Sequence, residues 1–321
     1  MAILLALSLL LAGGDWEFRP GTGFLNRKTM EQKTPDEFLE LGLKLHADKN
    51  DEEALEILAL LVEAPVEAGP REKGLFLRAR ILAEGGKAFE GYQEFDRFTR
   101  LFPESEQTSK AREWLMACAL ELAKAGHKDF LFFKTSKTGI DLLRTTLQRF
   151  PRETFTDDYY LKFARFYIDR GDLDFAETEL KTLLDSYRTT NSAPRALLML
   201  ADVGRRRFEG VAYDVKVLAD CKRYYEQFLG DYPRLADDPA ALQGFDLDGE
   251  RLAAMVQECR DGIRFVTGRL AEKELELAKF YLRRDRPKSA RLYLRTILKS
   301  YAGTPAAEEA QKLLDGIAGQ E

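Results

Sequence analysis

Residues 160–184 read YLKFARFYIDRGDLDFAETELKTLL, and this stretch decides the fold. Within it, Ala164 and Ala176 are twelve positions apart, with large apolar side chains at helical spacings on both sides of a turn at Gly171. Small residues let two antiparallel helices cross closely, and large residues fill the space around the crossing. The stretch therefore predicts a hairpin of two packed helices.

The same pairing of small residues, twelve positions apart, occurs four times along the chain. The pairs are Gly42 with Ala54, Ala79 with Gly91, Ala164 with Ala176, and Ala278 with Ala290. Tyr167 and Tyr281 each follow the first alanine of their pair by three positions and complete the predicted packing set. Gly42 and Ala79 are 37 residues apart, close to the roughly 34-residue period of tetratricopeptide repeats. We therefore predict an all-α, tetratricopeptide-type helical-hairpin solenoid of about five to six helix pairs, closed by a C-terminal capping helix.

Helix ends are marked by proline. Proline cannot continue a helix, so an aromatic residue followed by proline predicts the end of a hairpin. Such pairs are Phe102-Pro103, Phe150-Pro151 and Tyr232-Pro233. At the other end, Thr34 followed by Pro35 is typical of a helix N-terminus, because threonine caps the first turn and proline fits its first position. The solenoid is expected to span residues 35–321.

Two hairpins depart from the regular spacing. Residues 127–137 are inserted between the helices of the third hairpin. In the fifth hairpin the small residue Ala201 is followed by Cys221 twenty positions later instead of twelve, so we expect its first helix to be long. An acidic stretch after Pro233 then leads into a long helix that ends near Arg284.

The N-terminus differs from the rest of the chain. The apolar run over residues 3–11, followed by Ala12 and Gly14, is typical of a signal-peptide core with small residues at its cleavage site. We expect residues 1–14 to be a signal peptide, too short to span a bilayer as a stable helix, and the protein to be exported. Residues 15–34, with Pro20, Gly21 and Gly23 and no clear period, are expected to be a flexible tether.

Composition disfavours several classes of function. The chain has 49 basic and 54 acidic side chains and a net charge of -5, which argues against a nucleic acid partner. Its three cysteines are far apart and lack metal-ligand spacing, so we expect buried thiols and no metal. Its two histidines belong to no nucleophile motif. We therefore predict no catalytic residues, no cofactor and no enzyme activity.

Basic residues of the first helix in several hairpins lie at or beside positions expected to line a groove. They are Lys44, Arg78, Arg80, Lys162, Arg165, Lys279 and Arg283. Such side chains could bind the carboxylates of an extended peptide. The alternative is a solvated helical face with Glu and Asp partners at i,i+4.

The inserted segment of the third hairpin contains Phe130, Phe132 and Phe133 close together. Large apolar residues in a loop are either buried beneath it or form a docking patch, and burial is the favoured interpretation. Trp16, Phe18 and Phe24 of the expected tether pose the same choice. Two short basic runs lie at the C-terminal ends of predicted helices. Their positive charges either interact favourably with the negative end of the helix dipole or contact anionic lipid headgroups or an acidic partner surface. The runs are Arg205-Arg206-Arg207 and the group Arg283, Arg284 and Arg286.

The chain nearly repeats itself at Ala164-Arg165-Phe166-Tyr167 and Ala278-Lys279-Phe280-Tyr281. These stretches resemble the tetratricopeptide repeats of the BamD-like (YfiO-like) family of outer-membrane assembly lipoproteins. The resemblance implies a non-enzymatic, periplasmic protein–protein interaction scaffold, similar to the BamD component of the machinery that assembles outer-membrane β-barrels. It also implies protein partners, either a barrel-assembly component or unfolded outer-membrane protein precursors.

The chain departs from that family at the lipid anchor. Leu11-Ala12-Gly13 is followed by Gly14, where such lipoproteins carry an acylated cysteine. A lipid anchor is therefore not supported, and we expect the protein in the periplasm or at the periplasmic face of the outer membrane, with peripheral membrane association left open. The oligomeric state is also left open.

Two other functions remain as alternatives. One is an exported tetratricopeptide adaptor of the cell-division or peptidoglycan machinery. The other is the helical platform of a cell-wall enzyme, which we disfavour because the repeat pattern leaves no stretch for a separate catalytic domain.

Overall fold

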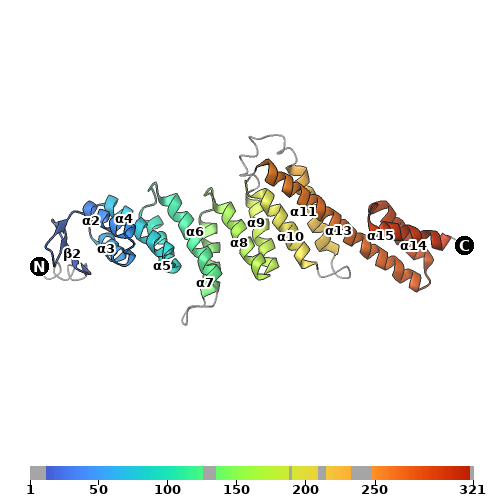
Figure 1. The fold of residues 1–321 in the computed structure, drawn as a ribbon, viewed down its shortest axis with the longest axis horizontal. Helices are drawn as coiled ribbons and strands as arrows, with labels where there is room; N and C mark the ends of the chain where they lie inside the picture. The colour runs from blue at the N-terminus through green and yellow to red at the C-terminus, as the bar shows by residue number, and fades with distance from the viewer. Residues whose placement is uncertain (1–11, 126–134, 188–189, 209–214, 233–247, 319–321) are drawn as a thin grey trace. The chain divides into compact units, whose positions relative to one another are not determined.

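The computed structural model describes residues 12–125, 135–187, 190–208, 215–232 and 248–318. It divides into two units, Met1–Thr156 and Asp157–Glu321, each built mainly from antiparallel helices joined in hairpins (Figure 1). The all-α, tetratricopeptide-type helical-hairpin solenoid that the sequence predicts is confirmed. The inserted residues Phe130, Phe132 and Phe133 lie outside the described residues, as do residues 1–11 of the expected signal peptide.

The first unit contains three hairpins. Their helices are α2 (Pro35–Ala47), α3 (Asp51–Glu63), α4 (Ala68–Glu84), α5 (Ala88–Leu101), α6 (Thr108–Ala125) and α7 (Thr135–Arg149). α2 starts as the sequence predicts, because the Thr34 hydroxyl accepts a hydrogen bond from the Glu37 N–H and the Glu37 carboxylate accepts one from the Thr34 N–H. The hydrogen bonds that the Thr34 N–H and hydroxyl donate to the Glu37 carboxylate lower the pKa of Glu37.

The expectation of a flexible tether over residues 15–34 is corrected by the structure. This segment forms most of a four-stranded antiparallel sheet in the order β1-β2-β3-β4. The strands are β1 (Ala12–Gly13), β2 (Trp16–Arg19), β3 (Gly23–Asn26) and β4 (Gln32–Lys33). Gly23 makes the close pairing possible, because its φ is +89° and a Cβ there would lie 2.4 Å from the Lys33 carbonyl oxygen.

The sheet folds because its aromatic side chains cover the first hairpin. Trp16, Phe18 and Phe24 are buried in one cluster with Phe38 of α2. The Phe24 and Phe38 rings stack with centroids 3.9 Å apart, and Trp16 meets Phe38 edge-on at 5.1 Å. Large aromatic rings bury much apolar surface, so these contacts fix the sheet on α2. Of the two possibilities for the three aromatic residues, burial is the one found, because they pack against the first helical hairpin.

The second unit contains the remaining hairpins and a last helix. Its helices are α8 (Thr156–Arg170), α9 (Leu173–Ser186), α10 (Ala193–Arg207), α11 (Val215–Asp231), α13 (Gly249–Arg283), α14 (Pro287–Ser300) and α15 (Pro305–Ala318). Consecutive helices pack from α9 to α11, α11 packs on α13, and α13 packs on α14. α15 covers both α13 and α14, as expected of a capping helix.

One expectation about the fifth hairpin is wrong. Its first helix, α10, is 15 residues long and ends at Arg207, so it is not a long helix. The wide spacing between Ala201 and Cys221 lies instead in the connection to α11, which starts at Val215. The two residues still meet, because the Cys221 thiol lies 3.2 Å from the Ala201 carbonyl oxygen.

The small residues lie where the helices cross. Ala54, Ala79, Ala164, Ala176, Ala278 and Ala290 are all fully buried. A Cβ added to Gly42 would lie 2.9 Å from a methyl carbon of Leu58, and one added to Gly91 would lie 3.1 Å from Ala83. Tyr167 is buried and stacks on Phe175, whereas Tyr281 is half-buried and stacks on Tyr293.

The third hairpin uses a pair of small residues that the twelve-position rule does not show. A Cβ on Gly139 of α7 would lie 2.4 Å from the Ala123 backbone nitrogen of α6. Only a glycine allows the two backbones to approach this closely. The pair Ala123 and Gly139 is sixteen positions apart, because residues 126–134 lie between α6 and α7 in the sequence. The insertion predicted over residues 127–137 is therefore corrected at its end, since α7 already starts at Thr135.

The cysteines are buried and unpaired. Cys118, Cys221 and Cys259 form no disulfide. Burial raises the pKa of Cys118 and Cys259 to about 12 and that of Cys221 to about 11. A thiol with such a pKa stays protonated at neutral pH and packs as a small apolar side chain.

Candidate partner-binding surfaces

Three of the predicted groove residues belong to the first unit. Lys44 of α2 is exposed and has no ion-pair partner among the described residues. Arg78 of α4 is half-buried and its guanidinium donates to the carboxylate of Glu94 on α5. Arg80 lies 3.5 Å from the Glu84 carboxylate, one turn along the same helix. Arg78 and Arg80 therefore fit the alternative of a helical face with internal ion pairs.

Two of the four groove residues in the second unit form ion pairs. Lys162 lies 2.8 Å from the Asp158 carboxylate and over the Tyr159 ring. Lys279 of α13 lies 2.8 Å from Glu309 of α15 and 3.6 Å from Glu276, and the hydrogen bond with Glu309 raises its pKa. Lys279 thus ties the capping helix to α13.

The other two, Arg165 and Arg283, are exposed and form no ion pair with any residue that the structure describes. Together with Lys44 of the first unit, they are the predicted groove residues that remain available to a ligand. The other four, Arg78, Arg80, Lys162 and Lys279, are occupied by acidic neighbours within their own unit.

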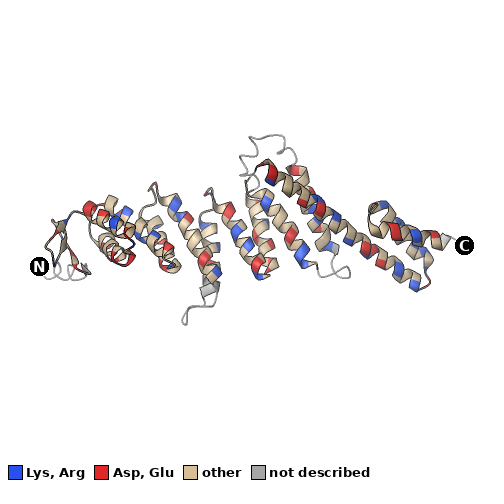
Figure 2. Cartoon of the chain, in the orientation of Figure 1, with Lys and Arg blue, Asp and Glu red and all other residues tan. Residues whose placement is uncertain are grey.

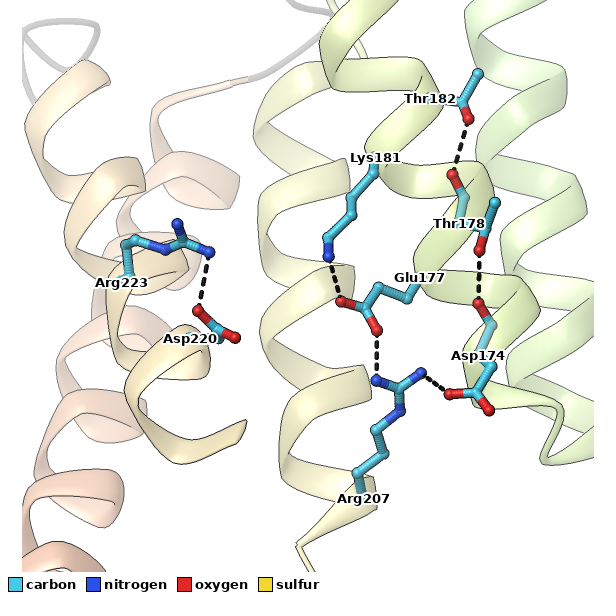
Figure 3. Close-up of polar contacts among 8 residues, drawn as sticks. All are labelled: Asp174, Glu177, Thr178, Lys181, Thr182, Arg207, Asp220 and Arg223. Carbon is cyan, nitrogen blue, oxygen red and sulfur yellow. Dashed lines mark hydrogen bonds and ion pairs between the residues drawn. The ribbon is translucent and has the colours of Figure 1, made fainter. Parts of the chain in front are cut away.

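Four charged side chains join α9 to α10 and are here named the α9–α10 seam: Asp174, Glu177, Lys181 and Arg207 (Figure 3). The Arg207 guanidinium, at the end of α10, donates to the carboxylates of both Asp174 and Glu177 on α9. Lys181 lies 2.5 Å from the other oxygen of Glu177. One carboxylate is thereby held between two cations.

The pKa directions of Glu177 and Lys181 agree with mutual stabilisation of opposite charges within the seam. Burial disfavours the ionised form of Glu177, but its contacts with Lys181 and Arg207 outweigh burial and lower its pKa. The hydrogen bond with Glu177 in turn raises the pKa of Lys181. Each charged side chain of the seam is paired with an opposite charge of the seam. The seam therefore links two hairpins and is a poor candidate for a ligand site.

A second cluster, here named the Phe265 cluster, consists of Phe265, Arg205 and Arg269. Phe265 on α13 is 38% exposed. The guanidinium carbon of Arg205 on α10 lies 5.5 Å from the centre of the Phe265 ring, and that of Arg269 lies 5.2 Å from it. An exposed aromatic ring is therefore held by two cations from two helices.

Tyr225 of α11 packs against α13 near this cluster. Its ring is fully buried and lies against the α13 backbone at Gly262, where a Cβ would come within 2.3 Å of it. Interaction with the Tyr225 hydroxyl raises the pKa of Arg205, and burial raises the pKa of Tyr225 to about 12. Tyr225 therefore stays neutral at neutral pH.

The Phe265 cluster has the composition of a partner-binding surface. Aromatic residues and arginine are enriched at protein interfaces and supply most binding hot spots. Two guanidinium groups at the rim of an apolar ring can hold a carboxylate while the ring packs against an apolar side chain. Sequence reasoning found only the basic run at Arg205, because Phe265 is 60 positions away and no local pattern connects the two.

The described part of the chain contains no metal-binding cluster and no membrane-spanning helix. Within it, no group of three or more His, Cys, Asp or Glu side chains is arranged to hold a metal ion. None of the described helices has both the length and the apolar composition needed to cross a bilayer.

Stacked helical hairpins with small residues at their crossings define the class of protein. The chain is a tetratricopeptide-type helical-repeat protein, and this fold suggests a scaffold for protein–protein interaction. No protein-family model matches the chain, and no curated protein matches it significantly.

Several solved structures are similar to the chain at low identity. A crystal structure of the MamA protein has 14% identity and a TM-score of 0.39, covering 64% of this chain and 94% of that one. A tetratricopeptide repeat protein from Parabacteroides merdae has 16% identity and a TM-score of 0.37, covering 88% and 98%. A thermophilic tetratricopeptide protein from Thermus thermophilus has 17% identity and a TM-score of 0.31, covering 70% and 100%. Because these TM-scores are low, the repeat class rests on the hairpins of this chain.

Proposed function

We propose that the protein is a non-enzymatic scaffold that binds another protein through the Phe265 cluster. The observation that carries the proposal is the exposed Phe265 ring between Arg205 and Arg269 on two helices of stacked hairpins. The charges of the α9–α10 seam are paired internally. Here the Phe265 ring is exposed, and the exposed Arg205 forms no ion pair with any described residue, whereas Arg269 also pairs with Glu272, 2.7 Å away on the same helix. A partner that offers an acidic side chain next to an apolar one fits this surface.

The proposal extends to where the protein acts. The resemblance of Ala164-Arg165-Phe166-Tyr167 and Ala278-Lys279-Phe280-Tyr281 to BamD-like repeats supports a role in the bacterial periplasm. In that role the partner is a component of the barrel-assembly machinery or an unfolded outer-membrane protein precursor. The apolar sequence of residues 3–11 supports export, and Gly14 in place of a lipid-bearing cysteine supports attachment through the partner.

Site-specific crosslinking in cells tests the binding surface. A photo-crosslinking phenylalanine analogue at position 265 of the full chain should capture one defined protein, identified by mass spectrometry. The same analogue at Phe175, which is 54% exposed on α9, is the matched control and should not capture that protein. Capture of the same protein at both positions, or of none at 265, would contradict the proposal.

A second measurement tests the two cations. In the purified complex, Arg205→Gln with Arg269→Gln should raise the Kd about 10-fold or more, because removal of hot-spot residues costs over 1.4 kcal/mol. Export is tested separately by cell fractionation with N-terminal sequencing of the mature chain. A cytosolic protein with an intact Met1 would overturn the periplasmic part and leave the binding surface to be judged by the crosslink.

A further inference from the structure

The last hairpin carries an unbalanced positive charge. Between Arg283 and Lys299 the chain has seven Lys and Arg residues and a single acidic one, Asp285, although the whole chain has a net charge of -5. α14 itself, Pro287–Ser300, has no acidic residue. Figure 2 colours its basic residues blue. The rest of the chain therefore has a net negative charge that this hairpin does not share.

The exposed side of α14 is here named the α14 face and consists of Lys288, Leu292, Arg295 and Lys299. These positions follow one another at intervals of four, three and four residues, which places them on one side of a helix. All four are exposed, and Leu292 is 67% exposed in the middle of the three cations. The opposite side of the helix is buried against α13 and α15 through Ala290, Leu294 and Ile297.

The cations of the α14 face have no partner within the described residues. Lys288, Arg295 and Lys299 form no ion pair there, in contrast to the many i,i+3 and i,i+4 pairs on other helices. Lys288 and the N-cap residue Arg286 also lie at the positive end of α14, where cations are unfavourable. These two residues therefore do not stabilise the helix. Their positive charge is better explained by a binding partner outside the hairpin.

We propose that the α14 face docks the protein on a membrane surface rich in anionic lipid headgroups. The three cations contact the headgroups, and Leu292 inserts at the boundary with the acyl chains. The neighbouring turn adds Arg283, Arg284 and Arg286, all exposed, to the same end of the hairpin. Clusters of four to eight Lys and Arg on a helix are the pattern that anionic membranes bind.

The shape of the surface favours a membrane over a macromolecule. Extended peptides are commonly bound in a groove or along a sheet edge, whereas the α14 face is one exposed flank of a helix and has no aromatic ring among its four residues. Nucleic acid would use the cations but would gain nothing from an exposed leucine between them. A bilayer surface uses both, and binding through α14 is independent of the Phe265 cluster.

Vesicle co-sedimentation of the full chain tests the proposal. The protein should bind vesicles of equal phosphatidylglycerol and phosphatidylcholine, and bind pure phosphatidylcholine vesicles far less. The apolar sequence of residues 3–11 carries no charge, so binding through it would not separate the two vesicles. Arg295→Gln with Lys299→Gln should lower partition to the anionic vesicles about 30-fold, since each basic residue near such a surface contributes about five-fold.

The matched control removes two other exposed lysines, Lys110 of α6 and Lys216 of α11, by Lys→Gln changes. Its partition should change much less than that of the α14 variant. Leu292→Ser should weaken binding while the salt dependence persists, as expected if insertion and charge act separately. Equal binding to both vesicles, or equal loss in the control and α14 variants, would overturn the proposal. Retention of the protein by a poly-glutamate peptide or duplex DNA, without retention by anionic vesicles, would also overturn it.

Discussion

The α9–α10 seam and the α14 face lie in the same unit and use charge in opposite ways. In the seam, Arg207 donates to two carboxylates of the neighbouring helix and Lys181 holds one of them from the other side. On the α14 face, Lys288, Arg295 and Lys299 are exposed and meet no carboxylate among the residues described.

The difference separates charges that build the fold from charges that are available for binding. A half-buried network stabilises the fold because each member satisfies the others, and removing one leaves its partner poorly paired. An exposed, unpaired cation contributes little to stability, and at the positive end of a helix it is unfavourable. Substitutions in the seam should therefore lower the free energy of unfolding, whereas substitutions on the α14 face should leave it unchanged or raise it.

The largest effect is expected at the centre of the seam. Arg207→Met keeps the length and apolar part of the side chain but removes the donor shared by Asp174 and Glu177. We expect the free energy of unfolding to fall by about 1–3 kcal/mol, because the half-buried Glu177 carboxylate loses a charged hydrogen bond. The Asp174 carboxylate is 94% exposed and contributes little to this loss. Urea unfolding followed by circular dichroism at neutral pH measures it. A change below about 0.5 kcal/mol would show that the seam is no more than a surface ion pair.

The next effect is smaller and depends on pH. Because its partners lower the pKa of Glu177, its ionised form stabilises the fold; this contribution is fully present above the ordinary pKa of 4.5 and is lost as the pH falls through the lowered value. Glu177→Gln should therefore cost about 0.5–1 kcal/mol at neutral pH, with solvent screening limiting the size. The gap between the two proteins should close in acid. A gap that stays constant from neutral to acidic pH would contradict the assignment.

These features differ in how far the sequence reveals them. The hairpin at Ala164 and Ala176 could be predicted because both helices and their turn lie within residues 156–186, a stretch short enough for its periodicity to be readable. The sheet at residues 12–33 could not, because strands of two to four residues are too short to show a period and are held by aromatic contacts with Phe38. Trp16 and Phe18, two positions apart, were the available signal.

The candidate sites divide in the same way. The basic run at Arg205 is visible in the sequence, but its contact with Phe265 depends on how α10, α11 and α13 pack. The charge of Lys162 is equally visible, yet its pairing with Asp158 decides that it is not available to a ligand. The sequence shows which residues have side chains suited to a function. Which other side chains they contact depends on the fold.

On the α14 face, a charge reversal should stabilise the protein. Lys288→Glu replaces a cation with an anion at the positive end of the helix and places it three residues before Arg291. We expect the free energy of unfolding to rise by about 0.5 kcal/mol, from the helix dipole and an i,i+3 ion pair. Thermal unfolding at low salt measures the gain, which should shrink at high salt. Loss of stability would mean that Lys288 has a structural partner.

The smallest effect is expected in the middle of the face. Arg295→Gln removes an exposed cation without an ion-pair partner in the described residues and keeps a good helix-forming residue. The free energy of unfolding should change by less than about 0.5 kcal/mol, because surface substitutions away from networks have little effect. The same urea titration used for Arg207→Met checks this directly. If Arg295→Gln destabilised the protein as much as Arg207→Met, the α14 face would belong with the seam, and its cations would serve the fold and not a ligand.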